Sequence, residues 1–301
     1  MKRRYVWKHR RIGAFLIFME EITLQALLEA GCHFGHKAER WHPKAISFIY
    51  TKKDGIHIID LVKTKAGLEA AVQYVTDLVA NGGEMLFVGT KRQARGILKQ
   101  EAQAVGAPYF SERWVGGFLT NWEQVRKNIE KINRMTEEQA AGGWKKFPKH
   151  EQTKMSRYLE RIKIYYGGVL HLKQIPQAIF VVDVKKEIAA VREAKRCGVP
   201  LVAVVDTNSD PTGINYVIPA NDDAVGSVTF IVHIIAKAYQ KGRDLFAKKQ
   251  EADAAKAAEA KEKEAAKTQV KPVEVKKEPA TVDKKASEGK EKAKVTENKT
   301  K

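Results

Sequence analysis

Residues 178–182 read Ala-Ile-Phe-Val-Val and stop at Asp183, and residues 199–205 read Val-Pro-Leu-Val-Ala-Val-Val and stop at Asp206. A helical pattern lies between the two runs and ends at Gly198. Short apolar runs rich in β-branched residues are typical of parallel strands buried on both faces, and the intervening helix supplies the right-handed crossover. Because ligands and partners bind at the carboxyl edge of such sheets, we expect both aspartates at a functional edge.

Other segments extend this sheet or pack on it. A strong turn signal, Asp54-Gly55, separates two strand-like runs. The expected strands are 46–51, 56–60, 85–88, 108–110 and 216–219, and the expected helices are 22–30, 64–81, one that ends at Gly106, and 224–246. Strands that alternate with helices in this way predict an α/β fold built on a parallel sheet.

The formal net charge is +18 over 301 residues, and it is unevenly distributed. Residues 19–122 carry 12 Lys/Arg against 11 Asp/Glu, and residues 167–246 carry 9 against 8. The excess lies in the first 18 residues, in 123–166 with 11 against 6, and in 247–301 with 16 against 11. A near-neutral body with basic appendages favours a protein that grips RNA with its extensions over an enzyme with a charged nucleotide cleft.

Two features of the sequence bear on where the protein resides in the cell. The sequence has no run of about 18 apolar residues, so we expect no membrane span. Cys32 and Cys197 are isolated and fit neither a zinc ribbon nor a disulfide framework, which indicates a reducing compartment such as the cytoplasm.

We expect three regions along the chain. Residues 1–18 form a basic extension, which we interpret as a start assigned upstream of Met19; an organelle transit peptide is the alternative. Residues 19–246 form one α/β domain with an inserted helical hairpin at 121–166. Residues 247–301 are rich in Lys, Ala and Glu and contain no aromatic residue, so we expect a helix to about Lys267 and a disordered tail beyond it.

The insertion reads as two amphipathic helices around the turn Gly142-Gly143. Thr120 and Glu123 fit a capping box at the start of the first helix. Because the pair interrupts the alternation of strands and helices, we expect it to project from the body over a length on the order of 25 Å.

Cations on the outer faces of this hairpin have two interpretations. They are either simply solvated or in contact with a nucleic-acid backbone, which the nearby Trp144 and Tyr158 favour. The candidate RNA-binding residues here are Arg126, Lys127, Lys131, Arg134, Lys154, Arg157 and Arg161.

Two loops supply further candidate RNA contacts. Gly89 lies between a strand and a helix and is followed by Lys91 and Arg92, an arrangement that can hold a phosphate at a helix N-terminus. It lacks the P-loop pattern, so mononucleotide binding, RNA-phosphate contact and a solvated helix start all remain open. The corner Arg113-Trp114 is the second candidate.

Histidines and aspartates near the expected sheet edge raise the question of a metal. His33, His36 and His42 lie within ten residues, but their spacing matches no common zinc motif, and a packed loop is the alternative. Asp222 and Asp223 precede the closing helix, where capping and the helix dipole alone account for at least one carboxylate.

Eight ordered segments of the chain carry a resemblance to a known family. They are Gly31-Cys-His-Phe-Gly-His36, Trp41-His-Pro43, Gly55-Ile-His-Ile-Ile-Asp-Leu61, Leu86-Phe-Val-Gly-Thr-Lys-Arg92, Arg113-Trp-Val-Gly-Gly-Phe-Leu-Thr-Asn121, Phe180-Val-Val-Asp183, Val205-Asp-Thr-Asn-Ser-Asp-Pro211 and Ile218-Pro-Ala-Asn-Asp-Asp223. Together they resemble the bacterial S-two family of small-subunit ribosomal proteins, over residues of about 20–246. One departure is Ile175-Pro-Gln-Ala178, where the family usually has Leu-Pro-Asp-Ala.

This resemblance implies a three-layer, flavodoxin-like (Rossmann-like) parallel sheet with a protruding helical hairpin. It also implies a structural, non-enzymatic role in translation, on the solvent side of the small ribosomal subunit near the head–body junction. The implied partners are small-subunit rRNA and neighbouring ribosomal proteins, including ribosomal protein one.

The same resemblance implies a metal at the sheet edge, although no cofactor is required. The matching positions are His36, Asp206 and Asp222. One imidazole and two carboxylates make a zinc set only when a fourth ligand, such as one from a partner, completes it.

The alternative function is a nucleotide-dependent enzyme on the same doubly wound fold, because a fold alone does not identify a function. The missing phosphate-binding fingerprint and the charge confined to appendages both disfavour the enzyme.

Overall fold

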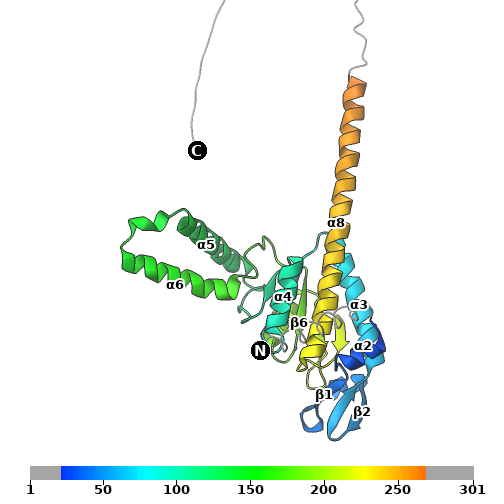
Figure 1. Ribbon diagram of the computed structural model, residues 1–301. Helices are drawn as coiled ribbons and strands as arrows, with labels where there is room; N and C mark the ends of the chain where they lie inside the picture. The colour runs from blue at the N-terminus through cyan, green and yellow to red at the C-terminus, as the bar shows by residue number, and fades with distance from the viewer. Residues whose placement is uncertain (1–21, 269–301) are drawn as a thin grey trace, which may run out of the picture. The chain divides into compact units, whose positions relative to one another are not determined.

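The computed structural model describes residues 22–268, with side chains as far as Glu251 (Figure 1). The expectations for residues 1–18 and for the tail beyond Thr268 lie outside these described residues. No helix within the described part is both long enough and apolar enough to cross a membrane.

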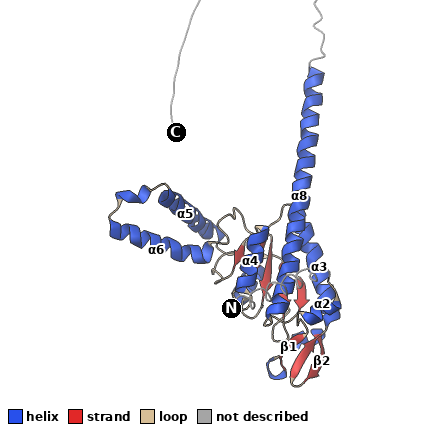
Figure 2. Ribbon diagram, in the orientation of Figure 1, coloured by secondary structure: helices blue, strands red, loops and turns tan. Residues whose placement is uncertain are grey.

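The core of the fold is a five-stranded sheet whose strands all run parallel (Figure 2). Its strands are β4 (Met85–Val88), β5 (Tyr109–Phe110), β6 (Ala178–Val182), β7 (Leu201–Val205) and β8 (Tyr216–Pro219). The spatial order β5-β4-β6-β7-β8 is the flavodoxin-like order, in which the chain switches direction between the first and third strands. The predicted flavodoxin-like α/β fold class is therefore confirmed.

Both faces of this sheet are covered because its strands are apolar at every position. One core cluster joins alternate strand residues such as Phe87 and Phe180 to the helices α2 (Leu24–Glu29), α3 (Leu61–Ala80), α4 (Arg95–Val105) and α8 (Val225–Thr268). The other cluster joins the intervening residues to α7 (Ile188–Cys197) and to the loop that contains Trp114 and Phe118. The result is three layers, with the parallel sheet as the middle layer.

A small antiparallel ribbon precedes the main sheet. It consists of β1 (Phe34–Lys37), β2 (Ile49–Lys53) and β3 (Ile56–Ile59), in the order β1-β3-β2. Asp54 and Gly55 form the predicted turn, with φ of 50° and 76°. The short helix η2 (Ala38–Arg40) follows β1.

The expected strand 46–51 begins later than predicted. Residues Pro43–Phe48 form the 3-10 helix η3 instead. Pro43 occupies its first turn, and the His42 Nδ1 accepts a hydrogen bond of 3.3 Å from the Lys44 N–H. Proline and this cap favour a helical start, so the strand forms only from Ile49.

The predicted helical hairpin is present as α5 (Trp122–Ala140), η4 (Gly143–Lys146) and α6 (Lys149–Tyr166). Val125 and Ile129 belong to the core cluster on the sheet, whereas Ile132, Trp144 and Leu159 form a separate small cluster between the hairpin helices. Its base is thus anchored in the main core, and its outer part is held together by its own side chains.

The capping box expected at the start of α5 does not form. Asn121 is the N-cap residue, with φ −132° and ψ 51°, and no side chain caps the helix. The backbone of this loop is held from another element, because Glu193 on α7 accepts hydrogen bonds from the Gly117 and Leu119 N–H groups.

Candidate functional site

Asp206 lies directly after β7 at the carboxyl edge of the parallel sheet, as predicted. Its side chain is fully buried. One carboxylate oxygen accepts hydrogen bonds from the Thr207 N–H at 2.5 Å and the Thr207 hydroxyl at 3.1 Å. The other accepts a bond of 3.3 Å from the Asp222 N–H. These contacts tie the end of β7 to the loop that follows β8.

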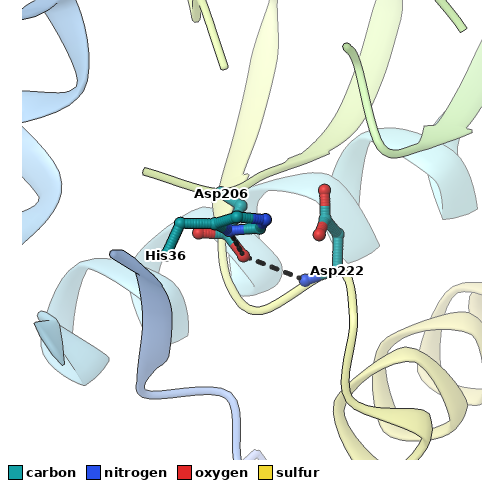
Figure 3. Close-up of side chains that lie close together, drawn as sticks. All are labelled: His36, Asp206 and Asp222. Atoms are coloured by element: carbon teal, nitrogen blue, oxygen red, sulfur yellow. Dashed lines mark hydrogen bonds and ion pairs between the residues drawn. The ribbon is translucent and has the colours of Figure 1, made fainter. Parts of the chain in front are cut away.

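His36 on β1 connects the ribbon to this edge (Figure 3). Its Nδ1 lies 3.1 Å from Asp206 Oδ2, and its Nε2 lies 3.2 Å from Asp223 Oδ2. The hydrogen bond to Asp206 raises the pKa of His36, which favours the protonated imidazolium. The neighbouring Gly35 allows this approach, because a Cβ there would lie 2.7 Å from the Thr207 methyl group.

Lys91 enters the same cluster from the loop after β4. Its ammonium lies 3.2 Å from Asp183, 2.8 Å from Asp222 and 2.6 Å from Asp223. Burial alone would lower the pKa of Lys91, but the bonds to Asp222 and Asp223 raise it. With 15% of its side chain exposed, this cation neutralises protein carboxylates.

The loop around Lys91 is held by α7 and the residues before it. Glu187 accepts bonds from the Thr90 N–H at 2.9 Å and from the Thr90 hydroxyl at 2.5 Å. Asp183 has a left-handed backbone with φ 70°, and its carboxylate accepts a bond from the Lys186 N–H. Helix α4 begins at Arg95, and the carboxylates of Glu187 and Asp183 contact the loop that precedes it.

Asp222 is the most enclosed carboxylate of the cluster. Burial, followed by the charges of Asp183 and Asp206, raises its pKa to about 7, and the Lys91 ammonium acts in the opposite direction. Its Oδ2 is buried and has no hydrogen-bond partner among the described residues. An orphaned carboxylate oxygen in a buried position indicates room for one more donor or cation.

The three residues of the implied metal set do come together. Ligand atoms of His36, Asp206 and Asp222 lie within 4.8 Å of one another (Figure 3). The donor set and the orphaned Asp222 oxygen fit a zinc ion that lacks its fourth ligand. The His36 nitrogens, however, already contact carboxylates, so binding would require these contacts to be exchanged for metal bonds.

The hairpin presents the other group of candidate residues. All seven of its predicted RNA-binding cations are exposed. Arg126 pairs with Glu130 at 3.1 Å and Arg134 with Glu138 at 4.0 Å, in each case one helical turn away. Lys127, Lys154 and Arg157 make no ion pair with a described residue, so their charge is free for an anion.

The two residues of the predicted corner at 113–114 differ in environment. Arg113 is exposed, as is Arg92 near the sheet edge. The Trp114 ring is 7% exposed, packs against Phe110 and Phe118, and donates its indole N–H to Glu193 at 2.9 Å. Trp114 therefore supports the loop from inside, where no base can stack on it.

Comparison with known proteins defines the family. Residues 27–242 match the model of the family described as ribosomal protein S2. The chain belongs to the ribosomal protein S2 family. It is 47% identical over 226 residues to a small ribosomal subunit protein uS2 from Coprothermobacter proteolyticus, covering 75% of this chain and 84% of that relative. A protein of the same name from Synechocystis is 43% identical over 225 residues, with 75% and 84% covered.

Membership of the ribosomal protein S2 family decides between the two functional hypotheses. The family consists of structural ribosomal proteins, so this member is not an enzyme. The buried carboxylates at the sheet edge are accordingly structural or ligand-holding groups, since no member of the cluster needs a catalytic role. The names of the family and its relatives mention no cofactor.

An apolar groove in this S2 family member was not predicted. It has a volume of about 400 Å³ and lies between α2, the ribbon and the start of α3. Its walls include Leu24, Leu28, Tyr50 and Val62, which are 45%, 52%, 75% and 64% exposed. A sequence signal existed, because Leu24 and Leu28 share one side of α2 while the buried Ala26 and Leu27 occupy the other.

Proposed function

We propose that this chain is a structural component of the small ribosomal subunit that holds small-subunit rRNA with the cations of its α5–α6 hairpin. As an S2 family member it works in the cytoplasmic ribosome, with rRNA and ribosomal proteins as partners. The residue-level contacts are our inference from charge and exposure.

The observation that supports the proposal most strongly is that the excess positive charge lies outside the α/β body, in the hairpin and the terminal segments. The α/β body is close to neutral, while the hairpin holds exposed cations on both helices. Phosphate contacts from Lys and Arg supply most of the sequence-independent affinity for nucleic acids. Val125 and Ile129 pack in the main core and so anchor the base of the hairpin that carries these cations.

The proposed RNA contacts are the seven hairpin cations together with Arg92 and Arg113, all of which are exposed. We leave out Lys91, because three carboxylates already neutralise it. We also leave out Trp114, because its ring is buried and its indole N–H is bonded to Glu193.

Co-sedimentation tests the proposal. The purified full chain should bind small subunits that were prepared without it, and the bound fraction should fall steeply as salt rises, because phosphate contacts release counterions. Binding that is insensitive to salt, or nucleotide turnover by the purified chain, would contradict it.

A protein partner is the second part of the proposal. The exposed apolar groove beside α2 lies on the ribbon that His36 ties to the sheet edge, and exposed apolar patches with a polar rim mark protein interfaces. The resemblance implies ribosomal protein one as a partner, and we propose it as the occupant of this groove. When the chain is immobilised on a resin, it should retain ribosomal protein one. Leu28→Asp should abolish this retention, whereas Ile164→Asp, at an exposed position on the hairpin, should not.

Zinc at His36, Asp206 and Asp222 is the third part, supported by the buried, unpartnered Asp222 Oδ2. The metal would act by fixing the ribbon to the sheet edge. Calorimetric titration with zinc should show one site that His36→Ala removes and that His150→Ala, at an exposed hairpin position, keeps. Equal binding by both variants would place the metal elsewhere.

A further inference from the structure

A small pocket opens between the two helices of the hairpin. Its volume is about 180 Å³. Its lining is partly apolar, with the buried Ile132 and Leu159, and partly polar, with Asn128 and the exposed Lys131. The pocket is smaller than the ~300–1,000 Å³ that enclose drug-sized ligands, so it has room for one flat nucleobase rather than a whole nucleotide.

One wall of this pocket is an exposed aromatic ring surrounded by positive charge. Tyr158 is 37% exposed. The Lys131 ammonium lies 5.4 Å from its ring centroid, and the Arg161 guanidinium lies 5.9 Å from it. Both cations are on exposed side chains, where cation–π contacts are weak, so an incoming ring can displace them and leave them at its flanks.

We propose that this pocket receives one unpaired RNA base, which stacks on Tyr158 while Lys131 and Arg161 bind its flanking phosphates. The inference rests on the proposed rRNA-binding function and adds the class of RNA that the hairpin selects. Unpaired bases are the usual target of sequence-sensitive RNA recognition, through stacking on aromatic rings and bonds to the base edges. The Asn128 amide, which lines the pocket, can both donate to and accept from such an edge.

The shape of the pocket argues for a base rather than for a phosphate or a paired stem. Ile132 and Leu159 offer a phosphate no polar partner, and a base within a duplex would first have to unstack to enter the pocket. An unpaired base has a flat apolar face and polar edges, which match this mixed lining. Hairpin cations on their own would position any RNA, whereas an inserted base would fix the register of the hairpin on its target.

Fluorescence anisotropy with the full chain tests the proposal. The probes are an RNA stem with one bulged adenosine and the same stem without the bulge. The wild type should bind the bulged stem about tenfold more tightly, the size expected for one stacked base. Tyr158→Leu should remove this preference without weakening binding to the paired stem, and Tyr158→Phe, which keeps the ring, should restore it.

The matched control is Tyr165→Leu. Tyr165 lies on the same helix, is 40% exposed and does not line the pocket. It should leave the preference unchanged. With 2-aminopurine as the bulged base, emission should fall when the wild type binds and not when Tyr158→Leu binds.

Each remaining outcome contradicts the inference in a different way. Equal wild-type affinity for the two stems would show that the pocket does not bind an unpaired base. Its occupant would then be another group, such as an apolar side chain of a neighbouring protein. If Tyr158→Leu weakens the affinity for both stems equally, Tyr158 only packs within the hairpin and does not stack on a base. Failure of the wild type to bind either stem would reject the proposed hairpin interface together with the pocket.

Discussion

Asp222 shows how a single buried carboxylate organises the sheet edge. Only 1% of its side chain is exposed, its N–H is bonded to Asp206, and one oxygen is bonded to Lys91. The second oxygen has no partner among the described residues. The Lys91 ammonium therefore compensates most of the cost of burying the Asp222 carboxylate. We expect the stability of the cluster to depend on pH.

Replacing Asp222 by Asn removes this titration. The folded-state pKa of Asp222 is raised by burial to about 7, above the value of an unfolded aspartate. Its stabilising contribution is thus fully present at low pH and is lost as the pH rises through about 7. We expect the unfolding free energy of the wild type minus that of Asp222→Asn to fall by about 1–3 kcal/mol between about pH 4.5 and about pH 8.

Urea denaturation of both proteins across this range measures the difference. The charge of Asp222 also helps to raise the pKa of His36, so the same pair of proteins is compared in a His36→Gln background, where that titration is absent. A difference that stays constant, or that grows as the pH rises, would mean that Asp222 is ionised without penalty in the folded protein.

Glu193 is a second carboxylate with a positioning role. It accepts bonds from the Trp114 indole at 2.9 Å, the Gly117 N–H at 2.8 Å and the Leu119 N–H at 3.1 Å. Glu193→Gln places an NH₂ donor where one of these bonds needs an acceptor. We expect a loss of about 1–3 kcal/mol in unfolding free energy, measured by urea denaturation.

The matched control is Glu39→Gln, the same chemical change at an exposed side chain, and it should change stability by less than about 0.5 kcal/mol. If Glu193→Gln is as mild as this control, the loop before α5 is held by the packing of Trp114 and Phe118 alone.

The positions of some residues at the sheet edge were predictable from the sequence, whereas their long-range partners were not. Asp183 and Asp206 follow unbroken apolar runs, so their place at the carboxyl edge was predictable. The partners of Lys91 could not be predicted. Its contact with Asp222 joins residues 131 positions apart, and a local sequence pattern carries no information about contacts over such a separation. Trp114 beside Arg113 suggested a surface aromatic, whereas its buried acceptor, Glu193, lies on a helix 79 positions away.

At the scale of elements, the hairpin has its own small core. Ile132, Trp144 and Leu159 make up its buried cluster, whereas the sheet buries two much larger ones. An element with few buried apolar side chains opens locally at a lower free energy than the sheet.

Leu159→Ala should therefore loosen the hairpin alone. Truncation of a buried leucine costs roughly 2–5 kcal/mol, which is comparable to what such a small cluster can supply. We expect faster amide hydrogen exchange in α6 and in the part of α5 beyond Ile129, and unchanged protection in β4, β6 and β7, measured by mass spectrometry.

Ile164→Ala, on the same helix with a side chain that is 60% exposed, is the matched control and should leave exchange unchanged. Equal loss of protection in β6 would show instead that the hairpin and the sheet open as one cooperative unit.

The helices and the central strands were predicted closely, because unbroken apolar runs and helical patterns can be recognised from the local sequence. β4 and β8 begin and end where expected, at 85–88 and 216–219. The start of β2 was wrong by three residues, since Pro43 and His42 favour a helical turn that the apolar pattern alone does not reveal. The cap of α5 was also wrong, because a contact from α7 orders the preceding loop.

At the scale of the whole molecule, function follows from where charge is placed. The body of 19–122 and 167–246 is almost balanced in charge, and the hairpin segment 123–166 has 11 Lys/Arg against 6 Asp/Glu. The parallel sheet supplies a rigid base, the carboxylate cluster fixes the ribbon to it, and the hairpin carries cations outward. The central claim is that these hairpin cations hold the protein on small-subunit rRNA.

The most direct measurement compares two full-length variants that lose equal charge. One carries Gln at Arg126, Lys127, Arg157 and Arg161 on the hairpin; the other carries Gln at Lys99, Lys185, Arg192 and Arg196, which are exposed on the body. Affinity for small subunits that lack the protein is measured as salt is varied. The account predicts that the hairpin variant binds at least about tenfold more weakly with a shallower salt dependence, while the body variant stays near the wild type. Equal losses in the two variants, or normal binding by the hairpin variant, would contradict it.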